Sequence, residues 1–343
     1  MDRLSRGLGK ARKQWLPLLL APPALLAVML NAWDFVTLWL DHDRTVEESG
    51  EQCLGLAREV ARYLAGSVQA VEVHITDHVE PAAARYLTGK PDRAVLQGAF
   101  RLTAQRLPQI TAILVFDRDG RLRETSRKAR PPGLEIGDEA FFRRHRDDGA
   151  DRSVFVAALD PSLPESNSSR WQLQVASRIV DDQGDFAGLV VASLDTEALF
   201  AVIGEMKMVT GAAVRIFDGD MRMLVNHPRD FTLIGRVFDH TRTVADWRRT
   251  RGELVGRIAD PTDGSPEIGA FRQIEPYTLT VSVGLAEDLA LAEWWRELAI
   301  LLGTAVIFLL VSVWGMRHRL AHWVLHTEHE VEERHGFMDG DGV

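Results

Sequence analysis

ILVFDRDGRL, residues 113–122, contains an apolar segment, an acidic turn and a second segment that returns along the first. This pattern is typical of a β-hairpin. VRIFDGDMRM, residues 214–223, repeats it later in the chain. Chance similarity between two hairpins is the alternative explanation. A true repeat predicts two antiparallel-sheet units with helices on one face, which is an α+β fold.

Further strands are predicted around both hairpins from alternating or continuous apolar segments bounded by turn residues. The expected strands lie near 152–158, 171–180 and 186–195 in the first unit, and near 252–259, 267–274 and 278–285 in the second. Helices are expected at 92–107, 138–146 and 196–208. Residues 41–88 carry apolar side chains at spacings of three, four and seven, which predicts a long stalk helix lying along a sheet.

Two uncharged segments flank this region. They are WLPLLLAPPALLAVMLNAW, residues 15–33, and LAILLGTAVIFLLVSVWGM, residues 298–316. As helices, each would span roughly 28 Å, close to the thickness of a bilayer's hydrocarbon core. Two membrane-spanning helices are therefore expected. A cleaved signal peptide is the alternative for the first segment, but three prolines interrupt it and no small-x-small cleavage site follows it.

Basic residues set the expected orientation, because they remain on the cytoplasmic side. Five of them precede the first apolar segment, and Arg317 and Arg319 follow the second. Both termini are therefore expected in the cytoplasm of a bacterium, with the intervening region in the periplasm and the two helices in the inner membrane.

The composition of the outer region excludes some classes of function. Residues 41–296 hold 40 acidic and 32 basic residues, a balance that disfavours nucleic-acid binding. Cys53 is the only cysteine, so the chain cannot form an intrachain disulfide and must rely on a hydrophobic core.

The order of these segments resembles the double Cache family, the PAS-like periplasmic sensor domains of bacterial chemoreceptors, histidine kinases and diguanylate cyclases. The resemblance rests on the stalk helix and on ILVFDRDGRLRETS, GDEAFFRRH, WQLQVASRIVDDQGDFAGLVVASLD, VRIFDGDMRMLVNHP and DGSPEIGAFRQIEPYTLTVSVGL. It implies the following organisation: a cytoplasmic N-terminus (1–14), a first membrane helix (15–38), a periplasmic region (39–293) with stalk helix (41–88), distal module (90–200) and proximal module (201–287), a second membrane helix (294–316) and a cytoplasmic tail (317–343).

The resemblance also implies that the distal module holds a small ligand. In the amino-acid-binding branch, an Arg two residues before an aromatic pair holds the ligand carboxylate, but here that position is Glu139, before Phe141 and Phe142. A carboxylate cannot donate the paired hydrogen bonds that an Arg guanidinium makes to a ligand carboxylate. An α-amino acid held in the usual way is therefore not expected. Asp195 matches the family's ammonium-binding Asp and would suit an amine. It also precedes a predicted helix, where a carboxylate would act as an N-cap.

Five residues complete the candidate ligand site together with Asp195. Arg178 suits a carboxylate or phosphate, although surface exposure is an equally good interpretation. Trp171, Phe141 and Phe142 could form an aromatic wall, with core packing as the alternative. His145 could bind the ligand or respond to pH, although an exposed helix position is the simpler expectation.

No catalytic motif, cofactor site or metal site is predicted. His74 and His78 are four residues apart, but two histidines alone make a weak metal site. His318, His322, His326 and His329 form a stripe at helical spacing. An amphipathic helix is the expected interpretation of this stripe, with metal or haem binding as the alternative. The absence of nucleophile and nucleotide-binding motifs argues against an enzyme, including a periplasmic hydrolase.

The sequence thus predicts a homodimeric, membrane-anchored sensor that binds an amine or another small solute. We expect it to signal through its membrane helices to a separate kinase or cyclase partner. Two alternatives are a periplasmic scaffold that binds proteins and a truncated receptor without an output.

Overall fold

The computed structural model describes residues 2–89, 91–128, 133–150, 152–157, 171–206, 210–239, 241–250 and 252–338. Within these ranges, the side chains of residues 2–27, 156, 316 and 318–338 are not described. The chain forms two compact units, each described by itself below. One comprises Met1–Thr45 with Leu291–Val343, and the other comprises Val46–Ala290.

A long helical segment begins the chain and supplies the expected stalk. α1 (Asp2–His74) continues into a π-helical turn, η1 (Ile75–Val79), and then into α2 (Glu80–Thr88). The backbone N–H of Glu80 donates to the carbonyl of Ile75, five residues back. Pro81 follows at the start of α2 and has no N–H to donate, so the regular hydrogen-bond ladder is interrupted at this point.

The first sheet, called the N-terminal sheet here, is antiparallel with strand order β2-β1-β5-β4-β3. Its strands are β1 (Ile110–Asp117), β2 (Leu122–Thr125), β3 (Arg152–Ala157), β4 (Gln172–Val180) and β5 (Phe186–Leu194). The helices around it are α3 (Arg93–Arg106), α4 (Ala140–Asp147) and α5 (Thr196–Glu205).

The second sheet, the C-terminal sheet, has the equivalent order β7-β6-β10-β9-β8. Its strands are β6 (Ala212–Phe217), β7 (Met223–His227), β8 (Glu253–Ala259), β9 (Pro266–Ile274) and β10 (Leu279–Ala286). Two short helices accompany them, α6 (Arg242–Trp247), which the sequence did not predict, and α7 (Glu287–Ala290). The matching strand orders confirm the prediction of an α+β chain with two antiparallel sheets and a long N-terminal helix.

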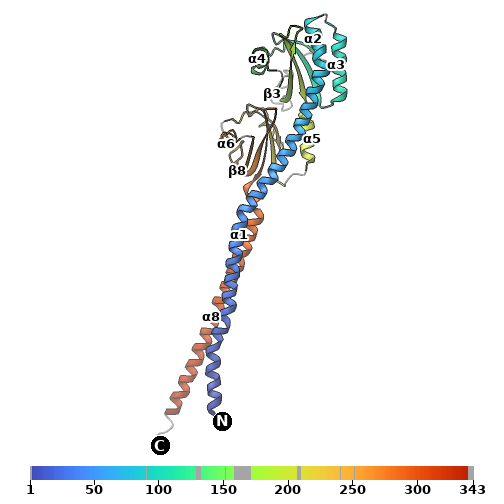
Figure 1. Cartoon of the computed structure of the whole chain (residues 1–343). Coiled ribbons are helices and arrows are strands. Elements are labelled where there is room, and N and C mark those ends of the chain that lie inside the picture. Colours follow the sequence, from blue (N-terminus) through green and yellow to red (C-terminus); the bar gives the residue numbers. More distant parts are fainter. Residues whose placement is uncertain are drawn as a thin grey trace. The chain divides into compact units, whose positions relative to one another are not determined.

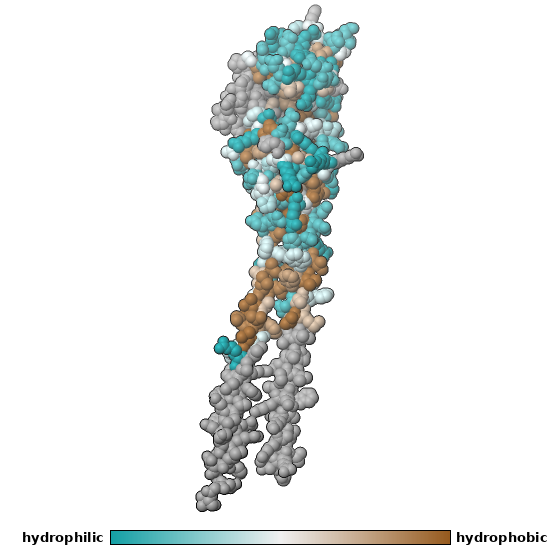
Figure 2. Space-filling model, turned by 90° about the vertical axis from the view of Figure 1, so that its left-hand side faces the viewer, coloured by the Kyte–Doolittle hydropathy of each residue, from teal (hydrophilic) through white to brown (hydrophobic). Residues whose placement is uncertain are grey.

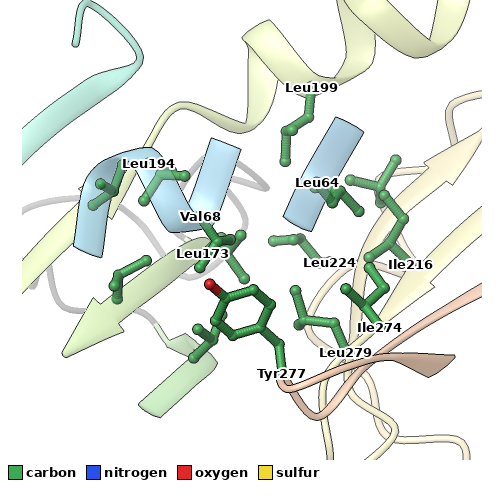
Figure 3. Packing of buried hydrophobic residues seen from close by; sticks show 14 of the residues in the cluster. Leu64, Val68, Leu173, Leu194, Leu199, Ile216, Leu224, Ile274, Tyr277 and Leu279 are labelled. Carbon is green, nitrogen blue, oxygen red and sulfur yellow. The ribbon is translucent and has the colours of Figure 1, made fainter. Parts of the chain in front are cut away.

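One hydrophobic cluster joins the stalk helix to both sheets (Figure 3). Leu64 and Val68 of α1 are fully buried against side chains such as Leu173 of β4 and Leu279 of β10. In Figure 1 the two sheets lie one after the other along α1. Because side chains alternate along a strand, each sheet has one face on α1 and a second face that is covered by other segments. The second faces are named here by the helices that pack on them, the α4 face and the α6 face.

α8 (Ala292–Met338) carries the second apolar segment and runs beside α1 (Figure 1). In the part of the chain whose side chains are described, one helical segment is long and apolar enough to cross a membrane, Ala292–Gly315. Most of its apolar side chains and most of those of residues 28–40 are exposed, and they form the large brown region of Figure 2, whereas Leu38 and Trp294 are buried. Most of the first apolar segment, 15–33, lies outside the described side chains, so a second span stays a prediction. The histidines of the tail also lie outside them.

Candidate functional site

The α4 face of the N-terminal sheet has an apolar centre. Leu114 of β1, Val191 of β5 and Ala176 of β4 are direct neighbours across the strands, and all three are buried. Phe142 of α4 packs on this centre with none of its side chain exposed. A second aromatic layer is only partly buried and comprises Phe141, Phe155 and Phe186.

Aromatic contacts hold α4 on the sheet. The rings of Phe141 and Phe155 stack with centroids 4.0 Å apart, and Phe142 meets Phe186 edge-on at 5.6 Å. Both geometries are favourable for aromatic pairs. The pairs tie α4 to β3 and to the start of β5, so the helix is fixed at two points of the sheet.

Arg178 lies at one end of this face. It follows Gln174 and Ala176 at intervals of two along β4, so the three side chains share the face. Its guanidinium carbon is 5.6 Å from the centre of the Phe186 ring, a cation–π distance. Its Nε is buried and has no hydrogen-bond partner within the described part of the chain. A buried donor without a partner is costly, and such groups in native proteins usually bind water, an ion or a ligand.

The opposite end of the face is polar but satisfied. Gln174 and Ser193 are both buried, and the Ser193 hydroxyl donates to Oε1 of Gln174 over 2.7 Å. The Gln174 amide also donates to the carbonyl of Ala157 over 3.4 Å. Gln174 and Ser193 could bind a ligand only by giving up these existing hydrogen bonds.

His145 is completely buried and anchors α4 to the segment after it, so the expectation of an exposed position was wrong. Its Nδ1 lies 2.5 Å from the carbonyl of Ala150 and must carry the proton, because a carbonyl can only accept. Its Nε2 is 2.6 Å from the Ser153 hydroxyl. Both ring nitrogens therefore have protein partners.

Asp195 acts as the N-cap of α5, where its carboxylate accepts the N–H of Glu197 over 2.9 Å. It lies far from Arg178. Arg178 is paired with Leu189 on β5, and Asp195 is six residues further on, roughly 20 Å at about 3.3 Å per residue. One α-amino acid cannot contact both side chains.

Trp171 does not join the other aromatic residues, and of the two interpretations, an aromatic wall or core packing, core packing applies to it. It directly precedes β4 and packs against the hydrophobic cluster of the stalk. The guanidinium of Arg222, which follows β6, lies 4.9 Å from its ring. A Cβ atom placed on Gly235 would lie only 2.3 Å from the indole nitrogen. Trp171 therefore packs between the two sheets.

The sequence-based site thus separates into three places. Arg178, Phe141 and Phe142 meet on the α4 face, His145 is buried beneath it, and Asp195 and Trp171 lie elsewhere. Phe155, Phe186 and the Gln174–Ser193 pair were missed. Counting back from Arg178 in steps of two would have found Gln174, whereas Phe155 and Phe186 belong to the site only through the packing of α4.

The solved structures that are similar to this chain include the following three. The extracellular domain of a putative histidine kinase shares 24% identity at a TM-score of 0.57, covering 72% of this chain and 98% of that one. The periplasmic sensory domain of the Campylobacter jejuni chemoreceptor Tlp1 shares 10% identity at 0.55, covering 72% and 98%. A structure named methyl-accepting chemotaxis protein X shares 11% identity at 0.54, covering 71% and 99%.

Comparisons by sequence alone identify no relatives of this chain. No protein-family model matches the chain, and no curated protein matches it significantly. The structural likeness nevertheless extends over nearly the whole of each sensory domain and agrees with the repeated sheet topology. The chain therefore has the fold of the periplasmic sensory domains of chemoreceptors and histidine kinases, as its resemblance to the double Cache family predicts.

Proposed function

We propose that this chain is a membrane-anchored sensor that binds a small carboxylate-bearing solute on the α4 face of the N-terminal sheet. The observation that carries the proposal is the buried Nε of Arg178, which has no hydrogen-bond partner among the described residues and lies beside the Phe186 ring. An Arg donor in such a setting suits a carboxylate, because a charge-assisted hydrogen bond is among the strongest available to it.

The partly buried aromatic rings support the same site. Phe141, Phe155 and Phe186 are neither core residues nor fully exposed, and they can cover the apolar part of a ligand whose carboxylate meets Arg178. Glu139 and the separation of Arg178 from Asp195 argue against an α-amino acid held at both ends. An amine at Asp195 is disfavoured, since that carboxylate already caps α5.

Membrane anchoring and signal relay belong to the same proposal. α8 presents exposed apolar residues over Ala292–Gly315, which suits a lipid environment. A ligand can move α1 and α8 only through different affinities for two arrangements of the sensor. We expect the chain to work as a homodimer, with both termini in the cytoplasm, and to pass the signal to a kinase or cyclase partner.

The scaffold alternative finds little support within the described part of residues 91–285. The exposed large apolar side chains of this range are few, and only two of them, Val95 and Leu102, share an element, α3. So few residues do not form the large apolar patch expected of a protein-binding surface. They are Val95, Leu102, Val180, Phe231 and Val255.

The test uses the full chain in lipid nanodiscs and a thermal-shift screen against monocarboxylates, dicarboxylates, amines and neutral amides. We expect at least one carboxylate to raise the melting temperature, and Arg178→Gln to abolish that rise. Arg146→Gln is the matched control, because Arg146 also lies over a ring of this region, 5.8 Å from the centre of Phe142, but is exposed. The proposal fails if no carboxylate stabilises the protein or if Arg178→Gln responds like the unmodified chain.

A further inference from the structure

The C-terminal sheet repeats the topology of the N-terminal sheet but carries different chemistry on the equivalent face. In the N-terminal sheet, Leu114, Val191 and Ala176 are neighbours across β1, β5 and β4. In the C-terminal sheet, the corresponding strands β6, β10 and β9 place Arg215 opposite Ser282, and Ser282 opposite Phe271. An apolar centre in one sheet is thus replaced by a polar one in the other.

Arg215 is the centre of a buried ion cluster. Its Nη1 and Nη2 donate to the two oxygens of Glu267 over 3.1 and 3.0 Å, and Nη2 also contacts Asp260. All three side chains are at least nine-tenths buried. Gly284 makes room for the carboxylate, since a Cβ atom there would lie 2.1 Å from Glu267 Oε2.

Three polar atoms on this face remain without partners among the described residues. They are Nε of Arg215, Oγ of Ser282 and the indole Nε1 of Trp247. Arg215 and Ser282 face each other across two strands, and Trp247 of α6 packs on Phe271 with ring centroids 6.2 Å apart. Ser282 is completely buried, and Arg215 is 4% exposed. A purely structural ion cluster accounts for the carboxylates but leaves these atoms unsatisfied.

The chemistry of the three atoms defines what could occupy the face. Two of them are N–H donors, and the hydroxyl can donate or accept. The required partner therefore presents oxygen acceptors. Arg215 already faces two carboxylates, so an additional anion would meet net negative charge.

We infer that the α6 face of the C-terminal sheet is a second ligand site, which takes a small uncharged solute through a carbonyl or hydroxyl oxygen bound by Arg215, Ser282 and Trp247. This site differs from the Arg178 site in the charge of its ligand, because the Arg178 site is proposed to bind a carboxylate. Carboxylate binding at Arg178 is tested by the thermal-shift screen and not by the experiment below. A negative result for one site therefore leaves the proposal for the other site standing.

The test compares acetamide with acetate, which has nearly the same shape but carries a negative charge. The full chain, labelled with 15N at the tryptophan indoles, is placed in nanodiscs and titrated with each compound. The indole N–H signal of Trp247 is identified as the one lost in Trp247→Phe, with Trp295→Phe, an exposed position on α8, as control.

We expect acetamide to shift the Trp247 signal in a saturable way and acetate to leave it in place. Ser282→Ala should weaken acetamide binding about fivefold, the effect of one lost hydrogen bond. Trp295→Phe should leave the acetamide response unchanged. The inference is overturned if acetamide gives no saturable shift, as expected when water alone satisfies these atoms. It is also overturned if acetate binds equally well, or if Ser282→Ala binds as the unmodified chain does.

Discussion

Tyr277, in the turn between β9 and β10, donates a 2.8 Å hydrogen bond to Oε2 of Glu72 on α1. The contact lies beside the apolar cluster that joins the stalk to both sheets, and Figure 3 shows the Tyr277 ring among those side chains. Because a hydrogen bond is directional, it fixes the position of the C-terminal sheet along the stalk helix. The apolar contacts around it are not directional and define this position less precisely.

Removing this hydrogen bond should destabilise the protein. Tyr277→Phe keeps the ring in the cluster but leaves Glu72 without its donor, and a lost bond to a charged acceptor costs about 1.5 kcal/mol. Urea unfolding of the full chain in nanodiscs measures the change. Tyr63→Phe is the control, because Tyr63 is exposed on the same helix. Equal stabilities for the two variants would contradict the assignment.

The same contact predicts a loss of stability in alkaline solution. Burial, reinforced by the hydrogen bond to Glu72 and by its charge, raises the pKa of Tyr277 above its ordinary value. A raised pKa in the folded state means that the stabilisation is complete below about pH 10, the unfolded value, and is lost as the pH rises beyond it. The urea midpoint should therefore fall more steeply between about pH 9.5 and 11 for the unmodified chain than for Tyr277→Phe. Parallel profiles would show that Tyr277 is not responsible.

Gly235 should tolerate no side chain, because Trp171 occupies the space. Gly235→Ala combines backbone strain at φ +81° with overlap between the new Cβ atom and the indole. The free energy of unfolding should fall by about 2–4 kcal/mol. Gly264 has nearly the same φ, +80°, and a Cβ atom added there would meet no other atom within 4 Å. Gly264→Ala thus isolates the backbone strain and should cost about 1–2 kcal/mol.

Chemical denaturation followed by tryptophan fluorescence separates these two glycine variants. If Gly235→Ala is no less stable than Gly264→Ala, then Trp171 does not pack between the sheets as described.

Arg215 should be essential to the C-terminal sheet whether or not a ligand binds there. Arg215→Met leaves the carboxylates of Asp260 and Glu267 buried without a cation, and breaking a buried pair in this way costs about 3–5 kcal/mol. Arg257→Met is the control, since Arg257 forms a half-exposed ion pair with Glu287 and should cost about 1 kcal/mol or less. Calorimetry of both variants checks the difference, and similar melting temperatures would contradict it.

Periodic features of the fold could be predicted from the sequence, because their side chains repeat. The stalk helix and the strands follow from apolar spacings, and the cap at Asp195 follows from a carboxylate preceding a helix. α6 was missed because six residues are too few to display a helical period. Trp171 and Arg178 were placed together because both belong to one predicted strand, although an odd separation places them on opposite faces. The burial of His145 depends on Ser153 and Ala150, partners that only the tertiary fold brings close.

A last prediction concerns the contact between α1 and α8. The indole nitrogen of Trp294 donates to the carbonyl of Leu38 over 2.8 Å, and the ring meets His42 edge-on at 5.0 Å. Trp294→Phe keeps an aromatic ring but removes the donor, so α8 should separate from α1 about five times more often, the equivalent of one neutral hydrogen bond.

Spin labels introduced by Val36→Cys and Ile300→Cys, both exposed positions, report the distance between the two helices in nanodiscs. The distance distribution should broaden in Trp294→Phe, while Trp295→Phe, which alters an exposed neighbour, should leave it narrow. If both variants retain the narrow distribution, the Trp294–Leu38 bond does not hold the helices together, and the relay of a signal through them must depend on other contacts. If only Trp294→Phe broadens it, then a side chain near the start of the apolar segment of α8 controls how tightly a motion of α8 is coupled to α1.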